Sequence, residues 1–174
     1  MEFLELAKKR YSCRSFLSKD VEQEKIDKIL EAARIAPTAV NLQPQRILVI
    51  KDKSKIEKLK DATRFTFDAP IMFVICYDKN ISWKRKYDGN DEGVIDASIV
   101  TTHMIFEATE LGLGTTWVGA FNPFKAREIL EVPENYEIIA LLPTGYPSED
   151  GIPSSSHEDR NSIEKIAFYE KFWK

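Results

Sequence analysis

The sequence predicts one domain of mixed helices and strands, for three reasons. Residues 21–35 carry apolar side chains at helical spacing. Residues 70–77 are continuously apolar, as expected of a strand buried on both faces. Residues 92–111 are apolar over much of a helix surface, so this helix should be buried inside the domain or against a second subunit. A length of 174 residues suits a single domain with its own core, and we take residues 1–174 as that domain.

Composition and charge exclude several classes of protein. Hydrophobic residues make up 43% of the chain and charged residues 30%, an ordinary balance for a folded soluble protein. The 25 Lys and Arg against 28 Asp and Glu give a net charge of −3, which argues against a nucleic-acid partner. No signal region or membrane-spanning run is visible, and Cys13 and Cys76 lack metal-ligand spacing. We therefore expect a cytoplasmic protein in a reducing compartment, with no membrane partner and no metal.

Apolar residues between Phe3 and Ala7 predict a short first helix that ends in the basic turn of residues 8–10, and a basic segment continues from there. It consists of Arg10, Tyr11, Ser12, Cys13 and Arg14. Two guanidiniums and a hydroxyl within five residues can hold a phosphate, because arginine binds phosphate oxygens in a bidentate way. Cations at a helix C-terminus also complement the helix dipole, so local electrostatics is the alternative explanation of the basic turn that ends at Arg10.

The linker over residues 36–45 follows the helix 21–35 and precedes a strand predicted at residues 46–50. Its two prolines oppose a continued helix. Its polar side chains include the hydroxyl of Thr38 and the amides of Asn41 and Gln43. An amide presents a donor and an acceptor together, which suits the edge of a heterocycle such as a flavin or a base. The alternative is that these amides only satisfy the backbone of their own loop.

The rest of the chain continues to alternate between helices and strands. Besides the strand 70–77 and the helix 92–111, we expect a helix at 54–61, a mobile loop over a pocket at 78–90, a helix at 124–130 and a strand at 137–143. The chain ends in an aromatic cluster made of Phe168, Tyr169, Phe172 and Trp173. So many aromatic side chains on a terminus must be buried somewhere, and a partner subunit is the natural place.

Small residues follow another strand, predicted at residues 115–118. Val118 is the last residue of this strand, and Gly119 and Ala120 come directly after it. Small residues at a strand end let a backbone amide approach a flat ligand closely, although they also simply make turns.

Taken in order, these segments resemble the nitroreductase family of FMN-dependent oxidoreductases. The matching segments are residues 10–14 after the first helix, 36–44 before a strand, 111–119 at the end of the long helix, 145–147, and the late Arg160. Each segment is weak alone, but together they cover the chain nearly end to end in the order of the family. The resemblance implies an α+β domain with a central mixed β-sheet flanked by helices. It also implies an intertwined homodimer with FMN at the subunit interface.

The resemblance further implies which residues bind the cofactor. Residues 10–14 would line the site, with Arg10, Ser12 and Arg160 on the FMN phosphate, Arg14 on the pyrimidine edge, and Tyr11 and Cys13 between them. Pro37, Thr38, Ala39 and Asn41 would approach from the partner subunit, with Gln43 supporting their loop. Gly119 would direct its N–H towards flavin N5, beside Val118 and Ala120. No side chain is expected to act as a catalytic acid or nucleophile, because the cofactor carries the chemistry.

The activity implied is reduction of a small-molecule substrate, such as a nitroaromatic, a quinone or a similar flat acceptor, by NAD(P)H in a ping-pong mechanism. Two alternatives remain: a flavin-binding or delivery module without turnover, and a specialised dehalogenase-like relative with another electron donor. Two features depart from the family. Gln45 stands where a tryptophan is common, and the stretch that covers the pocket is short.

Overall fold

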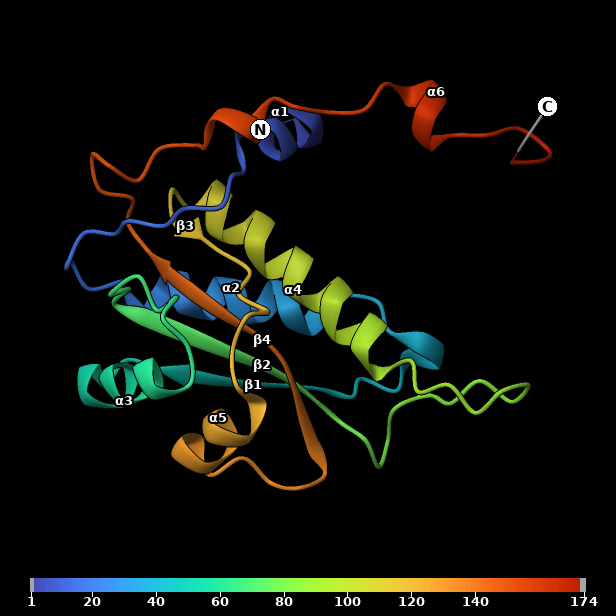
Figure 1. Cartoon of the computed structure of the whole chain (residues 1–174), viewed down its shortest axis with the longest axis horizontal. Coiled ribbons are helices and arrows are strands. Elements are labelled where there is room, and N and C mark those ends of the chain that lie inside the picture. Colours follow the sequence, from blue (N-terminus) through green and yellow to red (C-terminus); the bar gives the residue numbers. More distant parts are fainter. Residues whose placement is uncertain (1, 173–174) are drawn as a thin grey trace.

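The computed structural model describes residues 2–172, and its helices and strands alternate along the chain (Figure 1). The helices are α1 (Phe3–Lys9), α2 (Gln23–Ile35), α3 (Lys53–Lys58), α4 (Gly93–Glu110), α5 (Pro123–Leu130) and α6 (Ile163–Ile166). The strands are β1 (Gln45–Ile50), β2 (Ile71–Asp78), β3 (Gly114–Thr115) and β4 (Tyr136–Gly145). Short 3-10 turns lie at Ala39–Asn41, Leu59–Asp61 and Ser155–His157.

The four strands form one sheet in the order β1-β2-β4-β3. Neighbouring strands pair antiparallel in all three ladders. The expected α+β class is confirmed. A mixed sheet also contains parallel pairing, and within residues 2–172 the parallel pairing consists of the isolated bridge between Ser12 and Thr115. The N-terminal segment therefore extends the sheet beyond β3 without forming a strand of its own.

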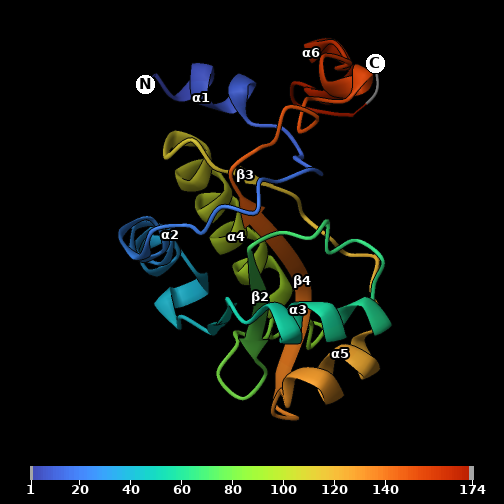
Figure 2. The same ribbon diagram turned by 90° about the vertical axis from the view of Figure 1, so that its left-hand side faces the viewer.

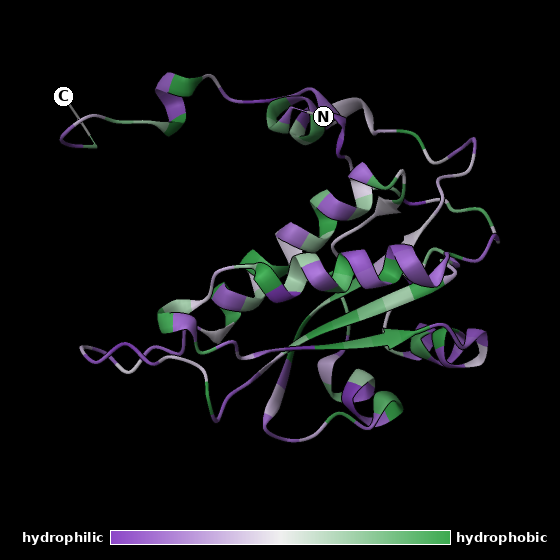
Figure 3. Cartoon of the chain, turned by 180° about the vertical axis from the view of Figure 1, so that it is seen from behind, coloured by the Kyte–Doolittle hydropathy of each residue, from purple (hydrophilic) through white to green (hydrophobic). Residues whose placement is uncertain are grey.

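Strand β2 lies at the centre of the core because both of its faces are covered. Ile71, Phe73 and Ile75 pack with α2 and α4, whereas Met72 and Val74 pack with α3 and α5. This division follows from the alternation of side chains along a strand. Figure 2 shows the resulting layers, with α2 and α4 on one side of the sheet and α3 and α5 on the other. Figure 3 shows the central strands as apolar.

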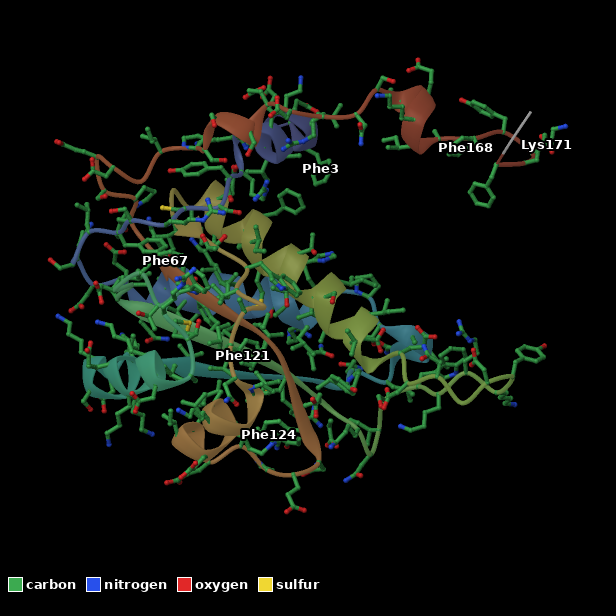
Figure 4. All side chains as sticks on the ribbon, viewed as in Figure 1. Phe3, Phe67, Phe121, Phe124, Phe168 and Lys171 are labelled. Carbon is green, nitrogen blue, oxygen red and sulfur yellow. The ribbon has the colours of Figure 1, made fainter. Side chains whose placement is uncertain are left out.

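Two segments project from this body. Residues 79–92 form an arm in which Lys84 pairs with Asp91 across an isolated antiparallel bridge, and Tyr87 in the arm is 98% exposed (Figure 1). The C-terminal tail, beyond about residue 158, also extends away from the sheet, as Figure 4 shows for Phe168 and Lys171. Its large apolar side chains are exposed, namely Ile163, Ile166, Phe168, Tyr169 and Phe172. Trp173, expected in the same cluster, lies outside the described residues.

Candidate functional site

A cationic cavity lies between the N-terminal segment and the start of the C-terminal tail. Its volume is about 210 Å³. It is lined by Arg10, Tyr11, Ser12, Arg14, Ser154, Ser156, His157 and Arg160. None of these residues is acidic, and several can donate hydrogen bonds. The structure therefore brings together residues of the predicted phosphate-binding group that are about 150 positions apart in the sequence.

The N-terminal half of the cavity is held in place by β3. The Cys13 N–H donates to the Thr115 carbonyl at 2.9 Å, and the Thr116 hydroxyl donates to the Cys13 carbonyl. Gly114 is necessary for this approach, because a Cβ there would lie 2.6 Å from the Cys13 Cβ. Tyr11 donates its hydroxyl to the Gly151 carbonyl, which joins the segment to the chain leading into the tail.

The charges of the cavity suit an anion. Burial lowers the pKa of the Arg10 guanidinium below its ordinary value, and the positive charge of Arg160 lowers it further. Within residues 2–172, the arginines that pair with carboxylates are Arg34, Arg46, Arg85 and Arg127. The three cavity arginines are not among them. Arg14 instead donates to the Ser12 carbonyl at 3.2 Å, and Arg160 donates to the Asp159 carbonyl at 2.7 Å. A phosphate would supply the negatively charged partner that these guanidiniums lack.

Cys13 differs from its neighbours because its side chain is fully buried. Its thiol donates to the Ser15 carbonyl at 3.2 Å, and burial raises the pKa of that thiol. The side chain is not among those that line the cavity. Any contribution of Cys13 to cofactor binding therefore comes from its backbone.

The segment after β3 is fixed but presents an open backbone at Gly119. Val118 and Leu141 exchange two backbone hydrogen bonds, of 2.9 and 3.0 Å. The Thr63 hydroxyl donates to the Ala120 carbonyl at 2.7 Å. Between these anchors, the Gly119 N–H has no hydrogen-bond acceptor among the described residues. A Cβ at Gly119 would meet only Trp117 Nε1, at 3.8 Å, so the space above this backbone is open.

The loop over residues 37–43 lies elsewhere. The Ala39 N–H donates to Asp96 Oδ1 at 2.8 Å, near the N-terminus of α4. The cavity segment lies near the opposite end of that helix, where Tyr11 and Thr109 line a common hollow. The helix between Asp96 and Thr109 is about 20 Å long at about 1.5 Å per residue. Within one chain, the predicted residues Pro37, Thr38, Ala39, Asn41 and Gln43 are thus far from the cavity arginines.

Of the two amide side chains in this loop, that of Gln43 bonds within the loop and that of Asn41 does not. The Thr38 hydroxyl accepts from the Gln43 N–H at 3.1 Å, and Gln43 Nε2 donates to the Asn41 carbonyl at 3.2 Å. The local alternative therefore accounts for one donor of Gln43. The Asn41 side chain is exposed and makes no hydrogen bond to a described residue, so its amide is free for a ligand.

Several site residues were not predicted. Ser154, Ser156 and His157 line the cavity, and the only signal in the sequence was a serine-rich loop before Arg160. Thr63 was missed because its contact with Ala120 joins residues 57 positions apart. No grouping of His, Cys, Asp or Glu able to hold a metal is present among the residues the structure describes. Within the same residues, no helix is long and apolar enough to cross a membrane.

Comparisons with known proteins agree with this architecture. The model of the nitroreductase family matches residues 7–66 and 61–146. A solved nitroreductase family protein of Clostridium difficile 630 is 47% identical, with 98% of this chain and 99% of that chain covered and a TM-score of 0.92. An FMN-dependent nitroreductase of Clostridium difficile R20291 is 31% identical, with 98% and 100% covered and a TM-score of 0.80. The FMN reductase [NAD(P)H] of Bacillus subtilis is 31% identical over 79% of this chain and 63% of its own.

The family model spans the N-terminal half of the cavity, the Gly119 backbone and the loop over residues 37–43, but it ends before the segment that carries Arg160. The fold agrees over nearly the whole chain with that of a solved family member at 47% identity. By fold, segment order and sequence, this chain belongs to the nitroreductase family.

Proposed function

We propose that this protein is an FMN-dependent oxidoreductase that takes electrons from NAD(P)H and passes them to flat acceptors such as nitroaromatics or quinones. The observation that carries the proposal is the carboxylate-free cavity in which Arg10, Arg14 and Arg160 meet. The names of the relatives support the cofactor and the donor, because one is an FMN-dependent nitroreductase and another an FMN reductase [NAD(P)H].

The cavity is proposed to hold the phosphate of FMN. Arg10 and Arg160 supply the charge, and the Ser12 hydroxyl, which has no hydrogen-bond partner among residues 2–172, can donate. On the other wall, the Ser154 and Ser156 hydroxyls lie 3.1 Å apart and share one hydrogen bond, so one of the two can donate to the phosphate, whereas His157 Nε2 already bonds the Lys8 carbonyl at 3.0 Å. A free phosphate ester carries close to two negative charges at neutral pH, so two or three guanidiniums match it well.

Gly119 and Arg14 are proposed to contact the ring system. When bound, FMN supplies hydride chemistry at N5. The unpaired N–H of Gly119 would hold that atom by a hydrogen bond, and the absence of a Cβ lets the backbone come close. Arg14 would place a positive charge near the pyrimidine edge and thereby favour the reduced, more negative ring. One face of the ring would stay open, so that nicotinamide and acceptor stack there in turn, in a ping-pong mechanism.

The site is proposed to form in a homodimer. Residues 37–43 cannot reach the cavity of their own chain across the length of α4, but they can complete the cavity of a second copy. Two exposed apolar surfaces support such a partner. On α4, Val94 and Ile95 are 46% and 52% exposed, and the tail carries exposed aromatic side chains (Figure 4).

Both cysteines are free, in accord with a protein of the cytoplasm.

The proposal is tested on the purified full-length protein. It should be yellow, elute as a dimer, and retain FMN at one per chain. Addition of NADH or NADPH under anaerobic conditions should bleach the flavin, and a quinone should restore the colour. Flavin that binds but is reduced by neither nucleotide would favour a different electron donor. Reduction without steady-state turnover on any acceptor would favour a flavin-delivery module. A colourless monomer that does not bind added FMN would exclude the proposal.

A further inference from the structure

The loop that precedes β1 has an unusual backbone. Val40, Asn41 and Gln43 have φ angles of 52°, 57° and 52°, in the left-handed region. Asparagine tolerates this region, but it is a rare conformation for a β-branched residue such as Val40. Such conformations persist only where the surrounding structure enforces them, and they cluster at ligand sites. Something must therefore hold this loop in place.

Within residues 2–172, one hydrogen bond joins residues 37–43 to an element other than the loop itself and the adjoining strand β1. It is the 2.8 Å bond from the Ala39 N–H to Asp96 Oδ1 on α4. The other bonds stay local. They run from Gln43 N–H to the Thr38 hydroxyl, from Gln43 Nε2 to the Asn41 carbonyl, and from Arg46 to the Gln43 carbonyl. Two backbone bonds also stay within the loop, from Asn41 N–H to the Thr38 carbonyl and from Leu42 N–H to the Ala39 carbonyl. The position of the loop relative to α4 thus depends on Asp96.

Asp96 is well placed to act as a fixed point. It is 2% exposed and lies in the first turn of α4, where the helix dipole stabilises a carboxylate. Its other oxygen, Oδ2, is buried without a hydrogen-bond partner among the described residues. A buried carboxylate with an unpaired oxygen lowers the stability of the folded state. Stability alone therefore does not explain why an aspartate stands at position 96.

We propose that Asp96 is a positioning residue for the flavin site. Its carboxylate fixes the Ala39 N–H and, through it, the left-handed turn that presents Thr38 and Asn41 to the FMN of the partner subunit. This inference rests on the proposed function, because the loop has a ligand to face only if the dimer binds FMN. Asp96 itself does not touch the cofactor in this arrangement.

The test compares Asp96→Leu and Asp96→Asn with a matched control, Asp91→Asn. Leucine keeps the branched shape of the side chain but replaces both oxygens with larger methyl groups, and replacing a poorly compensated buried charge by an apolar residue is often tolerated by the fold. Asparagine keeps an oxygen that can accept from the Ala39 N–H. Asp91 also lies at the start of α4, where it accepts from the Gly93 N–H at 2.9 Å, but it does not contact the loop. The readouts are FMN affinity, the visible circular dichroism of bound flavin, dimer content and the melting temperature of the apoprotein.

We expect Asp96→Leu to remain a folded dimer but to bind FMN at least about tenfold more weakly, which corresponds to about 1.4 kcal/mol. The flavin that stays bound should have an altered visible circular dichroism spectrum. Asp96→Asn should have an FMN affinity and a flavin spectrum close to those of wild type, and Asp91→Asn should leave both unchanged. If Asp96→Leu does not fold, Asp96→Ala replaces it with the same expectation.

Two results would overturn the inference. Wild-type FMN affinity and an unchanged flavin spectrum in the folded Leu or Ala variant would show that the loop does not need Asp96. Equal loss in the Leu and Asn variants would show that the charge, and not the hydrogen bond, is what matters. Neither result affects the proposed function, which would fail instead if wild type and Asp91→Asn also did not bind FMN.

Discussion

The hydroxyl of Thr63 donates a 2.7 Å hydrogen bond to the carbonyl oxygen of Ala120. The Thr63 hydroxyl oxygen in turn accepts from the Phe65 N–H at 3.2 Å, and Thr63 is 6% exposed. One buried hydroxyl thus joins the turn before β2 to the segment that carries Gly119. The geometry of the open backbone at Gly119 depends on a residue far away in the sequence.

Thr63→Val should therefore destabilise the protein and disturb the flavin site. The substitution keeps the shape but leaves the Ala120 carbonyl and the Phe65 N–H without this partner, at a cost of about 1–3 kcal/mol. Urea unfolding of the apoprotein measures that cost. Thr63→Ser keeps the hydroxyl and is the control, with an expected loss below that of the valine variant. Equal stability of wild type and Thr63→Val would contradict the structural role assigned to this bond.

Arg160→Ala should weaken cofactor binding without destabilising the apoprotein. FMN affinity should fall about ten- to a hundredfold, because one charge-assisted contact of roughly 1.5–3 kcal/mol is lost. The melting temperature of the apoprotein should not fall, since Arg160 repels Arg10 and has no carboxylate partner among the described residues. Arg34→Ala, which removes an exposed arginine paired with Glu31, is the control and should leave FMN affinity unchanged. Calorimetric titration with FMN decides the first point and thermal scans decide the second.

Arg14→Ala should slow flavin reduction as well as weaken FMN binding. Loss of the guanidinium removes a positive charge proposed to favour the reduced ring. The midpoint potential of the bound flavin should become more negative, and stopped-flow bleaching by NAD(P)H should slow. An unchanged potential in a variant that still binds FMN would place Arg14 away from the pyrimidine edge.

The hydrogen bond between Tyr146 and Glu22, at the start of α2, should make the stability of the protein depend on pH. Tyr146 donates its hydroxyl to Glu22 Oε2 at 2.6 Å, and this bond is the main reason that the pKa of Glu22 is lowered from 4.5 to about 2. A lowered pKa contributes stability that is present above pH 4.5 and lost as pH falls through about 2. Tyr146→Phe should therefore lower the melting temperature slightly at pH 6, and its difference from wild type should shrink between pH 4.5 and 2. A difference that stays constant over that range would show that the bond does not act through Glu22 ionisation.

Mixed dimers test the division of the site between two chains. One chain carries Arg10→Ala and Arg160→Ala, and the other carries Thr38→Ala and Asn41→Ala, so each homodimer should bind FMN poorly. A mixed dimer, purified by two different tags, should regain one intact site of its two. If each site were built from one chain alone, the mixed dimer would contain none, and FMN binding would not recover.

The long elements were predictable because their patterns arise from packing within the chain. The apolar run of β2 is buried on both faces, and the spacing of Ile26, Ile29 and Ala33 in α2 matches their burial. The end of strand β3 was expected at Val118, but the strand ends at Thr115 and Val118 forms only an isolated bridge. A two-residue strand leaves too little pattern to define its end.

The sequence predicted which segments meet in the candidate site, but not the direction of each side chain. Arg10, Ser12, Arg14 and Arg160 meet in one cavity, whereas the Cys13 side chain between them is buried in the interior. Spacing alone does not tell which of five consecutive residues faces a ligand in an irregular segment. Asp96 was missed for another reason. An aspartate in an apolar helix has no visible partner in the sequence, because its partner is a backbone N–H 57 positions away.

The length of α4 has a consequence for how this chain can change. The helix fixes the separation between the loop at its start and the cavity at its end. Each inserted or deleted residue would shift one end by about 1.5 Å and rotate it by about 100°. Substitutions on its surface are therefore compatible with the architecture, whereas insertions and deletions within it are not, and we expect natural length variation to be confined to the arm and the tail.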